Sequence, residues 1–79
     1  MGTRAFKYDK ILTRKFGQKI SFLRKNINIT QEELAFKANI SPSYLSAIER
    51  GVTDTTISTA KRLAKALNIS MAEIFTFNN

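Results

Sequence analysis

The chain contains no cysteine and no histidine. These absences exclude disulfides, thiol chemistry, zinc-finger ligation and the usual side-chain general base. An all-carboxylate metal site stays open in principle, but there are only six acidic residues and they form no tight cluster. No nucleophile–base pair can be assembled either. We therefore predict no metal, no other cofactor, no small-molecule ligand and no enzymatic activity.

Long apolar segments are also missing. No uninterrupted apolar run exceeds three residues, whereas a membrane-spanning helix needs about 20 apolar residues and a signal peptide about 7–15. We therefore expect a cytoplasmic protein. With 43% hydrophobic and 24% charged residues in a chain of 79, the composition is that of one ordinary globular domain.

Positive charge is concentrated in the first third of the chain. Residues 1–25 hold eight of the 13 Lys and Arg residues but only one acidic residue, Asp9. The remaining residues are balanced, so the formal net charge of +7 resides in this third. Such a segment suits a polyanion, and a merely solvated helix face is the alternative. A membrane surface is disfavoured because residues 4–15 offer few apolar side chains for an amphipathic face.

Apolar periodicity and capping signals predict an all-α protein. Leu12, Phe16, Ile20 and Leu23 recur at helical spacing and should form the inner face of a first helix. Gly17 should weaken that helix by about 1 kcal/mol relative to Ala. It could also divide an N-terminal extension from the first core helix.

Further helix starts follow along the chain. Thr30 and Ser70 each precede a glutamate by three residues, which is the capping-box spacing. Ser41-Pro42 is a typical helix start, and a fourth apolar face runs from Ile57 to Leu67. No segment alternates as a strand does. We expect a compact bundle of five short helices.

Two of these helices, 31–38 and 42–50, are joined by a tight turn around Asn39-Ile40-Ser41. This is the geometry of a helix-turn-helix. The first helix braces the second, which can then enter a DNA major groove about 12 Å wide. The exposed face of the second helix should comprise Pro42, Ser43, Ser46, Ala47 and Arg50.

Three segments carry a family resemblance: Phe16-Gly17-Gln18-Lys19-Ile20, Thr30-Gln31-Glu32-Glu33-Leu34-Ala35, and residues 41–51. They resemble the lambda-repressor/Cro-like (Xre-type) helix-turn-helix family, and residues 63–70 continue the match. Within it, the chain is most similar to phage-type repressors and to controller proteins of restriction–modification systems. The resemblance implies a lambda repressor-like DNA-binding domain. It also implies a transcriptional regulator that binds a palindromic operator on double-stranded DNA as a homodimer.

The same resemblance implies roles for single residues. Gln31 should contact backbone phosphate and could also reach a base. Ser43 should read a base, whereas Pro42 and Ala47 occupy reader positions without a hydrogen-bond donor in the side chain. Asp54 lies in a loop that is cationic in many relatives, so this loop has to bind phosphate through hydroxyls and backbone N–H groups. The basic N-terminal third could supply the missing charge. The predicted DNA contacts are Gln31, Ser41, Pro42, Ser43, Tyr44, Ser46, Ala47, Arg50, Thr53, Lys15, Lys19 and Lys25.

Two positions have competing interpretations. Arg24 carries the charge of a phosphate ligand, but its position in the family implies a structural ion pair with Glu49. Tyr44 could belong to the core, to a phosphate contact, or to both. At the level of the whole chain, an interaction module such as an antitoxin or anti-activator is the alternative to a DNA-binding regulator.

The chain is expected to divide into a basic arm at residues 1–10 and a helix-turn-helix domain at 11–77, with the motif at 31–50. A C-terminal helix over 70–77 should form the dimer interface, because apolar residues remain there once the core is assigned. They could also be ordinary core. These residues are Ile69, Met71, Ile74, Phe75 and Phe77.

Overall fold

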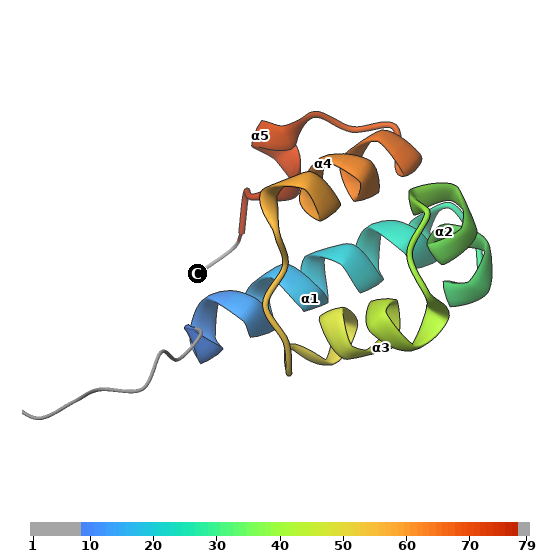
Figure 1. Cartoon of the computed structure of the whole chain (residues 1–79). Helices are drawn as coiled ribbons and strands as arrows, with labels where there is room; N and C mark the ends of the chain where they lie inside the picture. The colour runs from blue at the N-terminus through green and yellow to red at the C-terminus, as the bar shows by residue number, and fades with distance from the viewer. Residues whose placement is uncertain (1–8, 78–79) are drawn as a thin grey trace, which may run out of the picture.

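The computed structural model describes residues 9–77, and five helices follow one another within that range (Figure 1). The described residues form no strand, so the predicted all-α class is confirmed. In the same range, no helix has both the length and the apolar character needed to cross a lipid bilayer. Residues 1–8, which make up most of the predicted basic arm, lie outside the described part. The helices are α1 (Lys10–Asn26), α2 (Gln31–Ala38), α3 (Pro42–Arg50), α4 (Ile57–Ala66) and α5 (Met71–Ile74).

Every helix begins at a side chain that caps it. Each cap accepts a hydrogen bond from the backbone N–H three residues later, and the caps are Asp9, Thr30, Ser41, Thr56 and Ser70. Thr30 and Glu33 form a reciprocal capping box, with the Glu33 carboxylate 2.7 Å from the Thr30 nitrogen. Asn39 and Gly51 end α2 and α3 in the left-handed conformation, with φ of 58° and 74°. These local signals set the short connection between α2 and α3.

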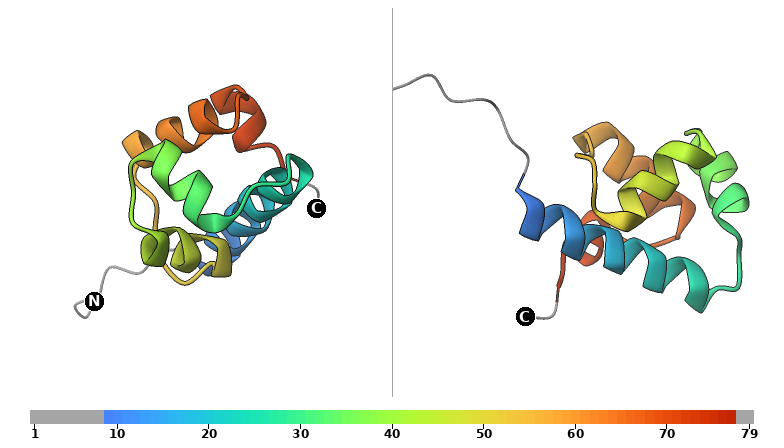
Figure 2. Two further views of the ribbon diagram at one scale, coloured as in Figure 1. Left: turned by 90° about the vertical axis from the view of Figure 1, so that its right-hand side faces the viewer. Right: turned by 90° about the horizontal axis from the view of Figure 1, so that it is seen from below.

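The helices pack around one core. α1 contacts α3 and α5, while α2 contacts α3 and α4 (Figures 1 and 2). Because every helix contributes at least one fully buried side chain, the core fixes the direction in which α3 faces outward. The largest of these side chains are Ile20, Leu34, Leu45, Ile48, Leu63 and Ile74.

The contact between α1 and α3 differs from the prediction. Thr13 is buried on the inner face of α1, whereas Leu12, expected there, is 47% exposed. Gly17 lies in the contact, where an added Cβ would stand 2.2 Å from the carbonyl oxygen of Ile48. α1 is continuous through this glycine, so the suggested division of the chain there is wrong. The backbone of α3 occupies the space that a side chain would need.

The last helix is shorter than the predicted 70–77. α5 ends at Ile74, and Phe75 already has φ of −103° and ψ of 11°. The Thr76 hydroxyl donates to the carbonyl of Ala72 at 2.8 Å, and the Thr76 backbone N–H bonds Glu73 instead. The hydroxyl thus takes the carbonyl that the Thr76 N–H would use in a continuing helix.

Candidate nucleic-acid interface

The first turn of α3 presents small polar groups at the surface. The Ser41 hydroxyl accepts from the Tyr44 backbone N–H at 3.1 Å and lies 3.4 Å from the Ser43 hydroxyl. Short side chains let a ligand approach the backbone, whose first N–H groups have no partner within the helix. The residues predicted for the outer face are all exposed or partly exposed: Pro42, Ser43, Ser46, Ala47 and Arg50.

The C-terminal end of α3 is fixed against α1. The Thr13 hydroxyl donates to the Gly51 carbonyl at 3.0 Å. A Cβ at Gly51 would stand 2.6 Å from the Cα of Arg14, and the φ of 74° already favours glycine there. Together with the close approach at Gly17, these contacts leave α3 little freedom to shift along α1.

A buried ion pair joins the first three helices. The Nε of Arg24 donates to Oε2 of Glu49 at 2.8 Å, and Nη2 donates to Oε1 at 3.0 Å. The two side chains are only 11% and 5% exposed. Nη1 of Arg24 also donates to the carbonyl of Ile29 at 2.9 Å. The hydrogen bond with Glu49 raises the pKa of Arg24 above its ordinary value, while burial opposes that rise. Arg24 is therefore engaged inside the protein.

Gln31 belongs to the same network. Its Nε2 donates to Oε1 of Glu49 at 2.9 Å, so one carboxylate oxygen bonds side chains from α1 and α2. The family resemblance implies a phosphate contact for Gln31, and in the structure its amide nitrogen is directed to Glu49. The start of α2 still offers the backbone N–H groups of a helix N-terminus.

Tyr44 has one role in the core and another at the surface. Its ring is half-buried and packs against the core cluster. Its hydroxyl donates to the backbone carbonyl of Asp54 at 3.3 Å. This bond ties α3 to the loop at residues 52–56, in which Thr53 is half-buried. The loop is therefore held beside the recognition helix.

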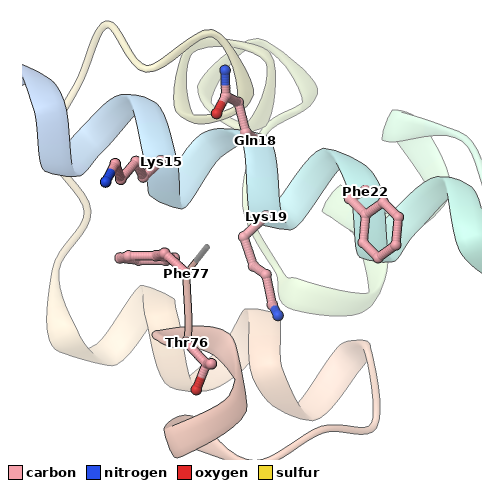
Figure 3. A pocket seen from close by; sticks show the side chains of 6 residues that line it. All are labelled: Lys15, Gln18, Lys19, Phe22, Thr76 and Phe77. Atoms are coloured by element: carbon pink, nitrogen blue, oxygen red, sulfur yellow. The ribbon is translucent and has the colours of Figure 1, made fainter. Parts of the chain in front are cut away.

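The three lysines predicted to contact phosphate lie in different places. Lys25 is exposed near the C-terminal end of α1. Lys15 and Lys19 stand two positions before and after Gly17, which places them about 160° around the helix from the side that contacts α3. Both line a groove on that far side (Figure 3), and Lys19 Nζ lies 2.7 Å from Glu73 Oε2. Because the backbone of α1 stands between them and α3, the structure does not bring Lys15 and Lys19 to the predicted surface.

The five residues predicted for a dimer interface do not form one patch: Ile69, Met71, Ile74, Phe75 and Phe77. Ile74 is completely buried inside the chain and offers no surface to a partner. Phe75 is 46% exposed, and its ring stacks on Phe16 with centroids 5.3 Å apart. Ile69 and Met71 line a groove on α4, whereas Phe77 lines the groove beside α1.

The sequence predicted the inner position of Ile20 and the pairing of Arg24 with Glu49, but not the contacts of Thr13 and Gly17 with α3. Thr13, Gly17, Ile20 and Arg24 form the α3-facing side of α1 at spacings of four, three and four residues. A small polar residue and a glycine four positions apart, Thr13 and Gly17, are the signal that could have revealed the close contact. Arg62 of α4 was also missed, and its Nε donates to a carbonyl at the end of α2 at 2.9 Å.

Comparisons with known proteins agree with this geometry. Over 58 residues the chain is 45% identical to the immunity repressor protein of Bacillus phage phi105, which covers 73% of the chain and 40% of the repressor. It is 33% identical to the control protein C.BamHI of Bacillus amyloliquefaciens, with 78% of each chain covered. The structure matches the restriction-modification controller protein C.AhdI from Aeromonas hydrophila with a TM-score of 0.78 and 36% identity. That match covers 80% of this chain and 96% of the controller.

The family match coincides with the described fold. The model of the helix-turn-helix family matches residues 20–74, a range that runs from the middle of α1 to the end of α5 and includes the whole α2–turn–α3 unit. The matched relatives named above are repressors and control proteins. The chain belongs to the helix-turn-helix family of DNA-binding transcriptional regulators.

Proposed function

We propose that the chain is a transcriptional regulator, of the repressor or controller type, that binds double-stranded DNA at a specific sequence. The observation that carries this proposal is the buried Arg24–Glu49 pair, which joins α1 to α3 and, through Gln31, to α2. A recognition helix braced in this way keeps a fixed angle to the rest of the domain. Its exposed first turn then fits a major groove about 12 Å wide.

Base readout is assigned to the exposed face of α3. Ser43 and Ser46 carry hydroxyls that donate to or accept from base edges. Pro42 and Ala47 have only apolar side-chain atoms, so Ala47 is assigned a contact with a thymine methyl group. Few long side chains stand on this face, which supports close contact between the helix backbone and the groove.

Phosphate contacts are assigned to groups around that face. The N-termini of α2 and α3 offer backbone N–H groups and the positive ends of helix dipoles. Arg50 at the end of α3 and Lys25 at the end of α1 are exposed cations. Thr53 supplies a hydroxyl from the loop held by Tyr44. Lys15 and Lys19 are left out because they lie on the far side of α1.

We further propose that two copies bind a palindromic operator as a homodimer. The copies contact each other at the end of the molecule where Leu12 and Phe75 line one shallow groove. These side chains are 47% and 46% exposed, and Ile57, which follows the loop at that end, is 80% exposed. A two-fold axis packs this patch against the same patch of the second copy. Among residues 9–77, Asp54 is the only charged residue that lines this groove.

The two grooves that hold other residues of the predicted interface are less suited to self-association. The groove with Ile69 and Met71 is lined by Lys61 and Lys65, so a two-fold contact would bring like charges together. The groove with Phe77 is lined by Lys15 and Lys19 and has the same difficulty. This difference favours the patch of Leu12, Ile57 and Phe75 as the dimer interface.

Selection of duplexes from a random pool tests the proposed function. The expected product contains two inverted half-sites with centres about 34 Å apart, or a multiple of that spacing. Binding measured by fluorescence anisotropy should weaken linearly with salt on a double logarithmic plot, because phosphate contacts release counterions. A pool without enrichment, or binding insensitive to salt, would contradict the proposal.

A further inference from the structure

One side of α1 combines exposed apolar side chains with basic side chains that are partly exposed. We call it the outer face and define it by Ile11, Lys15, Gln18, Lys19 and Phe22. Ile11 is 70% exposed and Phe22 is 60% exposed. Because one residue turns a helix by about 100°, all five lie on the side of α1 opposite Gly17. The proposed DNA surface and dimer patch use none of them.

Two grooves meet along the outer face. The first has a volume of about 220 Å³ and lies between α1 and the C-terminal segment, where Phe77 and Thr76 stand opposite Lys15 and Lys19 (Figure 3). The second, of about 260 Å³, is lined by Lys10, Ile11, Arg14, Lys15 and Gln18. Because they share Lys15 and Gln18, the grooves form one depression along the helix, with Ile11 lining one part and Phe22 the other.

The depression is positively charged. Lys10, Arg14, Lys15 and Lys19 line it, whereas no acidic residue of the described range lines either groove. Residues 10–26 of α1 contain no carboxylate at all. Glu73 reaches Lys19 from α5, with an Nζ–Oε2 distance of 2.7 Å. Lys10 and Arg14 are exposed at the second groove, and their charge is one that an acidic ligand complements.

We propose that the outer face of α1 binds an acidic segment of a partner protein that also carries apolar side chains. Ile11 and Phe22 are eleven positions apart, which is about 16 Å along the helix. A helical partner that matches this spacing would place two apolar anchors about eleven residues apart and carboxylates between them. The anchors would cover Ile11 and Phe22, and the carboxylates would meet the basic side chains between these two.

Other occupants fit this face less well. A second copy related by a two-fold axis would bring Lys15 and Lys19 against their own equivalents. Duplex DNA would leave Ile11 and Phe22 without apolar partners. A membrane needs a continuous apolar stripe on the helix, and here the basic side chains interrupt it. An acidic protein segment is the occupant that satisfies both the charge and the apolar side chains.

The position of this face on α1 allows a partner protein to bind without covering the proposed DNA surface. It lies about 160° around α1 from the side that contacts α3. A partner docked there would leave the first turn of α3 open. The regulator could therefore hold DNA and a partner protein at the same time.

A designed peptide tests the docking surface directly. The probe is a 15-residue helix-forming peptide with two Leu residues eleven positions apart and four Glu residues between them on the same face. It is titrated into the ¹⁵N-labelled full chain without DNA. We expect amide shifts confined to residues 10–22 and 76–77, with none in α3. A peptide with Lys in place of Glu, and one with Ala in place of Leu, should each bind at least tenfold more weakly.

Protein variants separate this site from general charge attraction. Phe22→Ser and Lys15→Glu should each weaken peptide binding at least tenfold, while circular dichroism shows an unchanged helix content. Lys61→Glu makes the same charge change at an exposed position of α4 and should leave affinity within twofold. Equal losses for Lys15→Glu and Lys61→Glu would overturn the proposal, as would shifts centred on α3. The proposal would also be overturned if the chain did not bind the peptide but bound anionic vesicles or duplex DNA, and if Phe22→Ser and Lys15→Glu weakened that binding.

Discussion

The guanidinium of Arg24 donates to both carboxylate oxygens of Glu49, at 2.8 and 3.0 Å, across 25 residues of sequence. Both side chains are nearly excluded from water, at 11% and 5% exposure. Oε1 of Glu49 accepts in addition from Gln31 at 2.9 Å. An ion pair in such a position stabilises the fold only while it is complete, because removal of one partner leaves the other charged and desolvated.

Glu49→Ala should therefore lower the free energy of unfolding by about 3–5 kcal/mol, as measured by urea denaturation. Double replacement by apolar residues, Arg24→Met with Glu49→Leu, should cost less than Glu49→Ala alone, since no buried charge is left. Glu32→Ala is the matched control, because that carboxylate is exposed; its loss should stay under about 1 kcal/mol. A loss below about 0.5 kcal/mol for Glu49→Ala would show that the pair does not brace α3.

For Gly17→Ala, helix propensity and the structure predict changes of opposite sign in the free energy of unfolding. Helix propensity alone predicts a gain of about 1 kcal/mol. The structure predicts a loss of about 1–3 kcal/mol, because the new Cβ would stand 2.2 Å from the Ile48 carbonyl oxygen and 2.8 Å from that of Glu49. Both neighbours are backbone atoms and cannot turn aside. Gln18→Ala, at an exposed position of the same helix, is the control. A stabilised Gly17→Ala protein would mean that α1 and α3 are not in such close contact.

The helix boundaries could be predicted because their causes are local. The hydroxyl of Thr30 and the carboxylate of Glu33 lie three residues apart, and Ser41 directly precedes Pro42. These residues cap a helix whatever surrounds it. The prediction therefore placed α2 and α3 at the residues where the structure has them. The end of α5 depends instead on whether the hydroxyl or the backbone N–H of Thr76 bonds the Ala72 carbonyl. The periodicity of the sequence does not predict which of the two does so.

The arrangement of side chains around α1 could not be predicted in the same way. Charge grouped Lys15 and Lys19 with Lys25 as phosphate ligands, but charge does not say which side of a helix faces its neighbour. That side is set by the close contact between Gly17 and Ile48, residues 31 positions apart in the sequence. The same contact turns Ile11 and Phe22 outward. Sequence patterns thus located the recognition helix, and only the packing assigned the sides of α1.

Variants of Ser43 and Lys25 should affect DNA binding in different ways. Ser43→Arg should change which bases are enriched in a selection from a random pool, because this exposed side chain starts the recognition helix. Lys25→Ala should weaken binding to all duplexes alike and reduce the salt slope by about one. Lys61→Ala, an exposed lysine on α4, should change neither. An unchanged base preference for Ser43→Arg, with an altered one for Lys25→Ala, would reverse the assignment.

The dimer patch can be tested at a residue that does not support the core. Ile57 is 80% exposed and is the first residue of α4, where a carboxylate suits the helix N-terminus. Ile57→Glu should therefore fold normally and sediment as a monomer at tens of micromolar, where the unchanged chain sediments as a dimer. Because each copy would then bind one half-site alone, operator affinity should fall about 100-fold or more. Phe36→Glu is the control, since Phe36 is 86% exposed on α2, outside the proposed patch. If both variants stay dimeric, or if the unchanged chain is a monomer without cooperative binding to DNA, the patch of Leu12, Ile57 and Phe75 is not the interface.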